Sequence, residues 1–290
     1  MINRYYKEGQ KLDVAGLNEI TVLLDRSETE FSEIGWNCWR PNLDGPPHKH
    51  NDKDQIFYIT DGVGKVRLGD QVFDVKPGCL AYVPAGMVHQ TITTGNEPLC
   101  YVLFNVFNTQ DKECHATFAD HIEKVKQIRK QQAESGNVAD DNEETLVDVK
   151  ACKFFTDVKD AKVYEFGSNT TTLLLDRNET NRVEFAVIKW REGMKGAMVA
   201  HKEKEQIFFV LDGEGEVTVD GVTQMVKPGH LVFVPRNTAH TTEATNGELT
   251  YLCLNSMVEN MNDESFDAMY HRIIEGRLKR FESGDDSIGE

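Results

Sequence analysis

The chain contains the same unit twice, and this duplication restricts its fold more than any other feature. Residues 21–89 align without a gap with residues 172–240 at a constant offset of 151, and 28 of the 69 aligned positions are identical. The run LLDRSET at 23–29, for example, returns as LLDRNET at 174–180. Each copy is long enough to enclose a core of its own. We therefore predict two tandem domains of one fold rather than a solenoid of short repeats.

Each copy consists of short runs that are typical of β-strands. In the first copy, QIFYIT, KVRL and QVFDV are separated by the turn sequences DGVG and GD, and this pattern predicts an all-β barrel or sandwich. The pairs Gly69-Asp70 and Asp220-Gly221 fit two-residue hairpin loops, where positive φ angles are needed. Strands do not alternate with helices, so the pattern excludes an open parallel sheet.

A segment with helical periodicity follows each copy, at 113–132 and at 264–281. The apolar residues that fall on one face of the first segment are Phe118, Ile122, Val125 and Ile128. We predict helices that pack on the outside of the barrels. We expect the histidines of these segments, His115, His121 and His271, to be solvated.

An acidic stretch separates the two copies. Between Lys130 and Lys150 there are six acidic residues and no basic residue, which is typical of a solvated linker. We place the domain boundary inside it and predict domains at 1–140 and 141–290.

The overall composition restricts the partners and the location. The formal net charge is -16, and this charge repels phosphate backbones and anionic lipid headgroups, so we expect neither nucleic acid nor membrane as a partner. The N-terminus lacks an apolar leader. The six cysteines do not fall in register between the copies (Cys38, Cys79, Cys100, Cys114, Cys152 and Cys253). We therefore predict reduced thiols in a cytoplasmic protein.

Histidines at metal-ligand spacing occur in the first copy. His48 and His50 are two residues apart, so on a strand both imidazoles leave the same face. Gln55 begins the next strand, and His89 follows a Pro-containing turn at 84–86. We predict that these four side chains converge on one divalent transition metal ion. Two alternatives stay open: the histidines are unligated polar groups at a barrel mouth, or Gln55 is hydrogen-bonded to a histidine.

The order of these residues resembles the two motifs of the cupin superfamily, G(x)5HxH(x)3-4E(x)6G and PxG(x)2H. The matching residues are Gly45, His48, His50, Gln55, Gly62, Pro84, Gly86 and His89. Two departures are a leading glycine closer to the first histidine and Gln55 in the place of the usual glutamate. The resemblance covers both copies. It implies a bicupin with two tandem jelly-roll (RmlC-like) barrels, each followed here by a helical segment.

The glutamine changes the charge of the predicted centre. With three neutral imidazoles and a neutral amide, a divalent ion keeps its full charge, and such an ion favours an anionic oxygen ligand. This favours Lewis-acid chemistry. Nitrogen and oxygen ligands suit Zn, Ni, Mn or Fe(II), one ion per functional barrel.

The second copy keeps three of the four candidate ligands. They are His201, Gln206 and His240. The equivalent of His48 is Val199, and the equivalent of Gly86 is Asn237, a residue that tolerates positive φ. The second barrel therefore either binds metal more weakly, with water completing the set, or keeps the ligands as a relic.

Four further residues are candidates for substrate binding: Arg40, Phe57, Tyr101 and Asn105. Phe57 points inward if Gln55 does. Tyr101 and Asn105 share one face of a strand and recur in the second copy, so a structural role is an open alternative. Arg40 could bind a carboxylate or stack beside Trp39. The sequence identifies no catalytic residue.

The ligand set is similar to that of small pectin-degradation cupins, which convert unsaturated uronates, and to sets in some polyketide cyclases and a bicupin isomerase of antibiotic synthesis. The resemblance implies a non-oxidative isomerase or lyase reaction on a small oxygenated or carboxylate-bearing, sugar-acid-like substrate at the N-terminal barrel. The alternatives are an Fe(II)-dependent dioxygenase and a non-catalytic protein that binds a sugar or a small acid. We expect the chain to act as a monomeric pseudo-dimer or as a homodimer.

Overall fold

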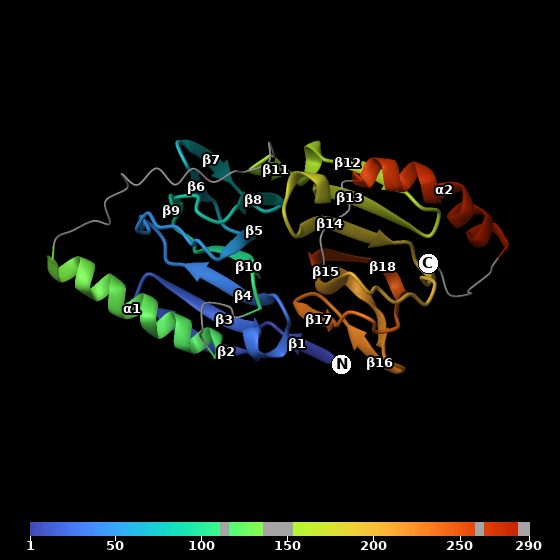
Figure 1. The fold of residues 1–290 in the computed structure, drawn as a ribbon, viewed down its shortest axis with the longest axis horizontal. Coiled ribbons are helices and arrows are strands. Elements are labelled where there is room, and N and C mark those ends of the chain that lie inside the picture. Colours follow the sequence, from blue (N-terminus) through green and yellow to red (C-terminus); the bar gives the residue numbers. More distant parts are fainter. Residues whose placement is uncertain (111–115, 136–152, 259–263, 284–290) are drawn as a thin grey trace. The chain divides into compact units, whose positions relative to one another are not determined.

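The structure is a computed structural model that describes residues 1–110, 116–135, 153–258 and 264–283. The chain divides into two compact units, Gly9–Lys159 and Met1–Glu8 with Asp160–Glu290. In each unit, antiparallel strands form the barrel and one α-helix follows it (Figure 1). The predicted fold class, two tandem all-β barrels each followed by a helix, is confirmed.

The first barrel consists of two antiparallel sheets. The larger has the order β11-β8-β5-β10-β4-β3-β2 and the smaller the order β7-β6-β9. The strands are β2 (Gln10–Val14), β3 (Asn18–Leu24), β4 (Ser32–Trp39), β5 (Lys53–Asp61), β6 (Gly64–Leu68), β7 (Gln71–Val75), β8 (Cys79–Val83), β9 (His89–Thr93), β10 (Leu99–Phe107) and β11 (Phe155–Asp157). Side chains from both sheets, such as Phe57, Val66 and Leu99, share one core cluster.

The second barrel is a single eight-stranded sheet with the order β1-β17-β15-β18-β14-β13-β12, and β16 pairs with β15. The strands are β1 (Ile2–Tyr5), β12 (Lys162–Glu165), β13 (Asn169–Leu175), β14 (Val183–Trp190), β15 (Lys204–Val219), β16 (Val222–Val226), β17 (His230–Val234) and β18 (His240–Met257). The sheet is continuous because β15 covers the positions of both β5 and β6 of the first barrel, and β18 covers those of both β9 and β10. Register shifts between Val210 and Gly215 bend this ribbon.

Two short strands do not follow the predicted domain boundary. Strand β1 belongs to the unit of the second barrel, and β11 belongs to the unit of the first. Strand β1 pairs with β17, with Ile2 opposite Phe233, and β11 pairs with β8, with Phe155 opposite Ala81. Each thereby provides hydrogen-bond partners for a strand that would otherwise be an open edge. The boundary predicted at residue 140 falls outside the described residues, so its position stays a prediction.

The predicted hairpin loops are present in both barrels. Leu68 pairs with Gln71, and Val219 pairs with Val222, so each loop has two residues. Asp220 has a φ of 52° and Gly221 a φ of 73°. The positive φ angles match the twist of the flanking strands.

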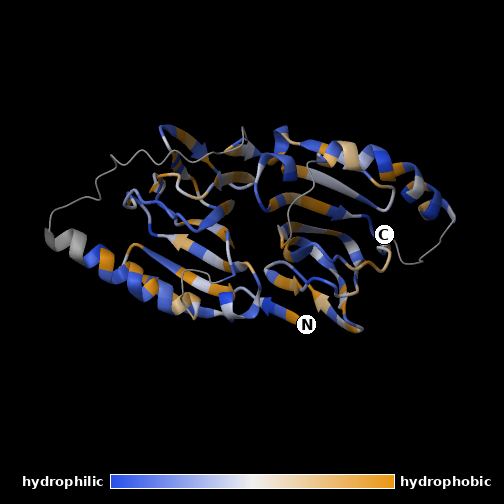
Figure 2. Cartoon of the chain, viewed as in Figure 1, coloured by the Kyte–Doolittle hydropathy of each residue, from blue (hydrophilic) through white to orange (hydrophobic). Residues whose placement is uncertain are grey.

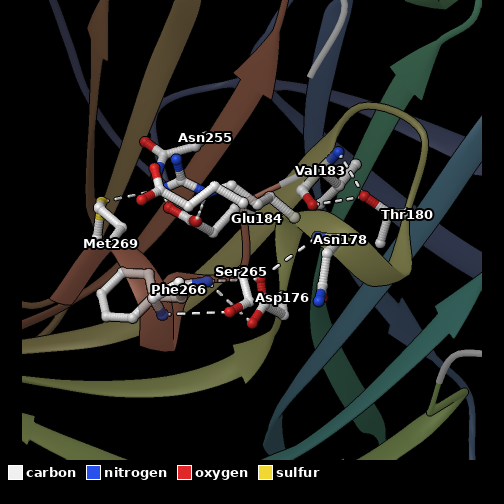
Figure 3. Close-up of polar contacts among 12 residues, drawn as sticks. Asp176, Asn178, Thr180, Val183, Glu184, Asn255, Ser265, Phe266 and Met269 are labelled. Carbon is white, nitrogen blue, oxygen red and sulfur yellow. Dashed lines mark hydrogen bonds and ion pairs between the residues drawn. The ribbon is translucent and has the colours of Figure 1, made fainter. Parts of the chain in front are cut away.

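A single aspartate in each barrel anchors the helix that follows. The backbone N–H of Phe118 at the start of α1 (Phe118–Ser135) donates to Asp25 Oδ2 over 3.0 Å, and that of Phe266 at the start of α2 (Phe266–Ser283) donates to Asp176 Oδ1 over 3.0 Å (Figure 3). The same aspartates cap the short 3-10 helices at Arg26–Glu28 and Arg177–Glu179. Each helix is therefore fixed to its own barrel.

Helix α1 packs against the barrel with the first part of its predicted apolar face. Phe118 and Ile122 belong to the interior core cluster of the first barrel, whereas Ile128 is 43% exposed. Hydrophilic and hydrophobic residues alternate along both helices (Figure 2). The Phe118 ring reaches this core because Gly35, which has no side chain, leaves room for it.

The cysteines give a second correction. Cys38 and Cys100 form a disulfide, so the prediction of reduced thiols is wrong for this pair. The two residues lie opposite each other on β4 and β10. The repeat comparison could not reveal them, because the second barrel has Lys189 opposite Thr250 in this region. Cys79 and Cys253 are free and buried, while Cys114 and Cys152 fall outside the described residues. Among the described residues, no helix is both long and apolar enough to cross a membrane.

Candidate metal centre

Three of the predicted ligands meet inside the first barrel. One potential ligand atom from each of His48, His50 and His89 lies within 4.8 Å of the others. The ring centroids of His48 and His89 are 4.2 Å apart, and those of His50 and His89 are 5.6 Å apart. The imidazoles are therefore close enough to bind one ion together.

Backbone hydrogen bonds hold these histidines in place. His48 N donates to His89 O over 3.0 Å, and His89 N donates to His48 O over 2.9 Å, in an isolated bridge. Gly86, with a φ of 83°, donates its N–H to His50 O over 2.6 Å. His48 lies in this bridge outside the regular strands, so the shared face comes from the bridge and the Gly86 turn.

The hydrogen bonds of the rings prepare them for a metal ion. His48 Nδ1 lies 2.9 Å from Pro46 O, and His89 Nδ1 lies 3.2 Å from Met87 O. A carbonyl accepts only from a protonated nitrogen, so Nδ1 carries the proton and Nε2 presents its lone pair. His89 Nε2 is buried without a hydrogen-bond partner.

Burial keeps all three rings neutral. It lowers the pKa of His48 to about 4, and it holds the pKa values of His50 and His89 well below the ordinary value. The positive charge of Lys53 lowers all three pKa values further. Neutral imidazole is the form that binds metal, so the site is ready at neutral pH.

A buried chain of hydrogen bonds orients Gln55. Arg26 Nε donates to Glu33 Oε2 over 2.6 Å, and Asn105 Nδ2 donates to Glu33 Oε1 over 2.7 Å. Gln55 Nε2 then donates to Asn105 Oδ1 over 2.8 Å. We call the chain Arg26–Glu33–Asn105–Gln55 the relay. All four residues are buried, with at most 6% of their surface exposed.

The relay leaves the Gln55 amide only one orientation. An ionised Glu33 can only accept, so Asn105 must direct its NH₂ group to Glu33 and its oxygen to Gln55. Gln55 must then donate its own NH₂ group to Asn105. This leaves Gln55 Oε1 buried without a partner, and an oxygen in this state suits a divalent ion. The alternative that Gln55 binds a histidine is thereby replaced by a bond to Asn105.

Sequence reasoning missed Arg26 and Glu33. Both are identical in the repeat, as Arg177 and Glu184, and this signal could have identified them. Charged residues that recur at equivalent positions beside apolar strands indicate an interior ion pair rather than a solvated face.

The other predicted residues are distributed between the interior and the surface. The Phe57 ring centroid lies 5.9 Å from that of His89 and forms an apolar wall beside it. Asn105 belongs to the relay. The Tyr101 hydroxyl accepts from Asn37 Nδ2 and Trp39 Nε1, each over 2.9 Å, inside the core. Arg40 is exposed and pairs with Asp13 at 3.8 Å, because strand alternation directs Trp39 inward and Arg40 outward.

Helix α1 places His121, which the sequence predicted to be solvated, close to His50. His121 is only 9% exposed, and its ring centroid lies 6.1 Å from that of His50. The expectation of a solvated His121 is therefore wrong. The reason is that the first turns of α1 pack against the core of the barrel through Phe118 and Ile122.

The second barrel repeats this arrangement without its first histidine. The rings of His201 and His240 are 5.4 Å apart, and burial lowers the pKa of His201 to about 3. Val199 forms with His240 the same two backbone bonds as His48 forms with His89, at 3.0 and 2.8 Å. Asn237 adopts a φ of 60°, as its tolerance of positive φ predicted, and donates to His201 O.

The second barrel contains a counterpart of the relay, formed by Arg177, Glu184, Asn255 and Gln206. Gln206 Nε2 donates to Asn255 Oδ1 over 2.7 Å, and Asn255 Nδ2 donates to Glu184 Oε1 over 2.6 Å (Figure 3 shows Asn255 beside Glu184). Arg177 pairs with Glu184. Gln206 Oε1 is buried without a partner, as Gln55 Oε1 is.

Both barrels match the same domain family. The Cupin domain family model matches residues 38–107 and 187–255, which covers the candidate ligands of both barrels. With two such domains on two jelly-roll barrels, the chain is a bicupin of the cupin superfamily.

Comparisons with known proteins give distant relatives. Quercetin 2,3-dioxygenase of Bacillus subtilis is 26% identical over 225 residues, 68% of this chain and 64% of that enzyme. An uncharacterized protein of Methanocaldococcus jannaschii is 38% identical over 52 residues, 18% of this chain and 42% of that protein. The matches thus cover less than two thirds of either relative. Oxalate decarboxylase from Bacillus subtilis has a similar structure, with a TM-score of 0.64 at 15% identity, over 88% of this chain and 76% of that one.

Proposed function

We propose that the protein is a metal-dependent enzyme whose active site is the first barrel. It catalyses a non-oxidative isomerase or lyase reaction on a small carboxylate-bearing substrate. The observation that carries this proposal is the combination of three neutral imidazoles with the unpartnered Gln55 Oε1. In this proposal His48, His50, Gln55 and His89 hold one Zn, Ni, Mn or Fe ion.

The charge of the ligands supports the reaction class. When bound, a divalent ion would supply Lewis-acid polarisation of a substrate oxygen. The relay leaves the amide oxygen of Gln55 without a partner, and with this neutral amide as the fourth ligand the protein would not reduce the charge of the ion. Phe57 and the core around it exclude water from one side of the site.

A relative supports a second candidate function. The match to quercetin 2,3-dioxygenase covers 68% of this chain, which favours an oxygen-dependent reaction at an iron or manganese centre as the alternative. Bacillus subtilis oxalate decarboxylase, which has a similar fold, contains Mn(II) centres.

Metal analysis of the purified protein tests the proposal, with the double variant His48→Ala/His50→Ala for comparison. We expect about one ion per chain in the wild type and a loss of this ion in the variant, with the fold retained. A double variant that keeps its full metal content would refute the site. Substrate-dependent oxygen uptake would replace the non-oxidative reaction by the dioxygenase, and a wild type without metal would leave a binding protein.

Two further proposals concern the second barrel and the partner of the protein. We infer a weaker second metal site at His201, Gln206 and His240, in which water completes the ligand set. The net charge of -16 supports a small molecule, rather than nucleic acid or a membrane, as the partner.

A further inference from the structure

Helix α1 presents one face to the first metal centre. Phe118 and Ile122 on this face are buried in the core, and His121 beside them lies close to His50. Arg129 follows Ile122 by seven residues and His121 by eight, so it lies on the same face about two turns further along. The helix therefore directs a guanidinium group toward the side of the barrel that holds the histidines.

The surroundings of Arg129 support this placement. Its side chain is half-buried, and Nη1 lies 3.4 Å from Val14 O, a long hydrogen bond. Its positive charge lowers the pKa of His48, and it is close enough to the buried Tyr101 for the two to interact electrostatically. The guanidinium therefore lies on the inward face of α1, and among the described residues its hydrogen bond is the long one to Val14 O.

Within the part of the chain that the structure describes, no carboxylate pairs with Arg129. The two fully buried carboxylates of this barrel have other partners, since Glu33 binds Arg26 and Asp54 accepts from Tyr82 over 2.8 Å. By contrast, the buried Arg26 has a carboxylate at 2.6 Å. Removing a cation from water without an anion is unfavourable, and burial accordingly lowers the pKa of Arg129.

The electrostatics of the interior favour an anion at this position. The ammonium group of Lys53 is buried nearby, and the proposed ion would add two positive charges that its neutral ligands do not reduce. A carboxylate between the ion and Arg129 would offset both cations. Guanidinium groups bind carboxylates through two parallel hydrogen bonds, which also fix the orientation of the ligand.

We propose that Arg129 binds the anionic group of a ligand held at the first metal centre, so that the first barrel selects small carboxylates. The inference rests on the proposed metal site and adds the residue that recognises the substrate. The second barrel places Arg277 at the same distance from the start of α2, but its guanidinium lies 4.8 Å over the ring of Phe166. Because the charge of Arg277 also lowers the pKa of His201, the first barrel differs by its third histidine, His48, and not by the presence of an arginine.

The test uses the full chain with one equivalent of Co(II), titrated with malonate and with neutral malonamide while the Co(II) absorption is followed. We expect Arg129→Met to weaken malonate binding about 10-fold or more, without weakening Co(II) binding and without changing the response to malonamide. Arg129→Lys keeps the charge and should lose less. Lys124→Met removes an exposed cation from the same helix and is the matched control, with unchanged malonate affinity expected.

Unchanged malonate affinity in Co(II)-loaded Arg129→Met would overturn the proposal, and so would an equal loss in Lys124→Met, because a general charge effect would then explain the result. Thermal unfolding of the Arg129→Lys variant shows whether substitution here disturbs the fold. A wild type that binds no Co(II) would instead refute the metal site, so the two failures are distinguishable.

Discussion

The two barrels differ at a single ligand position but share the structure around it. Where the first barrel has His48, the second has Val199, and both residues make the same pair of backbone bonds to the histidine opposite. Both barrels also orient a glutamine amide through the relay or its counterpart. The position of the ligands therefore comes from the barrel, whereas the completeness of the site depends on one side chain.

The barrels also differ in how they are closed. The first has the Cys38–Cys100 disulfide between β4 and β10, and its helix enters the core. In the second, Phe266 of α2 packs with Tyr164 and Phe166 in a cluster separate from the main core. The barrel that holds three histidines is thus the one with the more enclosed interior.

The ion pair of the relay should give the largest difference in stability. Arg26→Met leaves Glu33 buried without its cation, and we expect a loss of about 3–5 kcal/mol in the free energy of unfolding. Arg177→Met in the second barrel should cost less, because 13% of that side chain is exposed, against 1% for Arg26. Urea unfolding of the two variants measures the difference, and equal losses would contradict this ranking.

Exchange of the differing ligand should reverse the metal preference of the barrels. His48→Val should weaken metal binding in the first barrel more than about 100-fold, because loss of a ligand exceeds the effect of losing a supporting residue. Val199→His should create a site with three histidines in the second barrel. Metal titration of the single variants and of the double exchange measures the number of tight sites. If Val199→His gains no tight site, the backbone equivalence does not determine ligand placement.

Removal of the disulfide should destabilise the first barrel alone. Cys38→Ser/Cys100→Ser opens a loop with a sequence separation of 62 residues, and we expect a loss of about 2–4 kcal/mol. Reductant should lower the unfolding temperature of the wild type but have no effect on the variant, as followed by calorimetry. A wild type that is insensitive to reductant would show that the crosslink does not contribute.

Loss of Asn105, the residue of the relay that binds Gln55, should give the smallest effect. This effect is expected on metal affinity rather than on folding. Asn105→Leu frees the Gln55 amide to rotate, and metal binding in the first barrel should weaken about 10-fold. Asn255→Leu makes the same change in the second barrel and should leave the first site as it was. Isothermal titration with Co(II) compares them. The role of the relay would be disproved by full affinity in Asn105→Leu.

The sequence by itself determined the duplication, the all-β class, the hairpin loops and the candidate histidine ligands. These features depend on local signals: an offset of 151, glycines at turns, and two histidines two residues apart. Pattern and spacing are properties of neighbouring residues, so they can be read without knowing which strands pair.

Only the tertiary structure decided the relay, the disulfide, the partial burial of Arg129 and the approach of His121 to His50. Glu33, Gln55 and Asn105 come from three strands, and their contacts exist only because β10 pairs with both β4 and β5 in one register. A shift of one residue would direct each side chain to the opposite face. The same pairing brings Cys38 opposite Cys100, and the packing of Phe118 against Gly35 accompanies the approach of His121 to His50. Such long-range contacts have no local signature, because they depend on the register between segments that lie far apart in the chain.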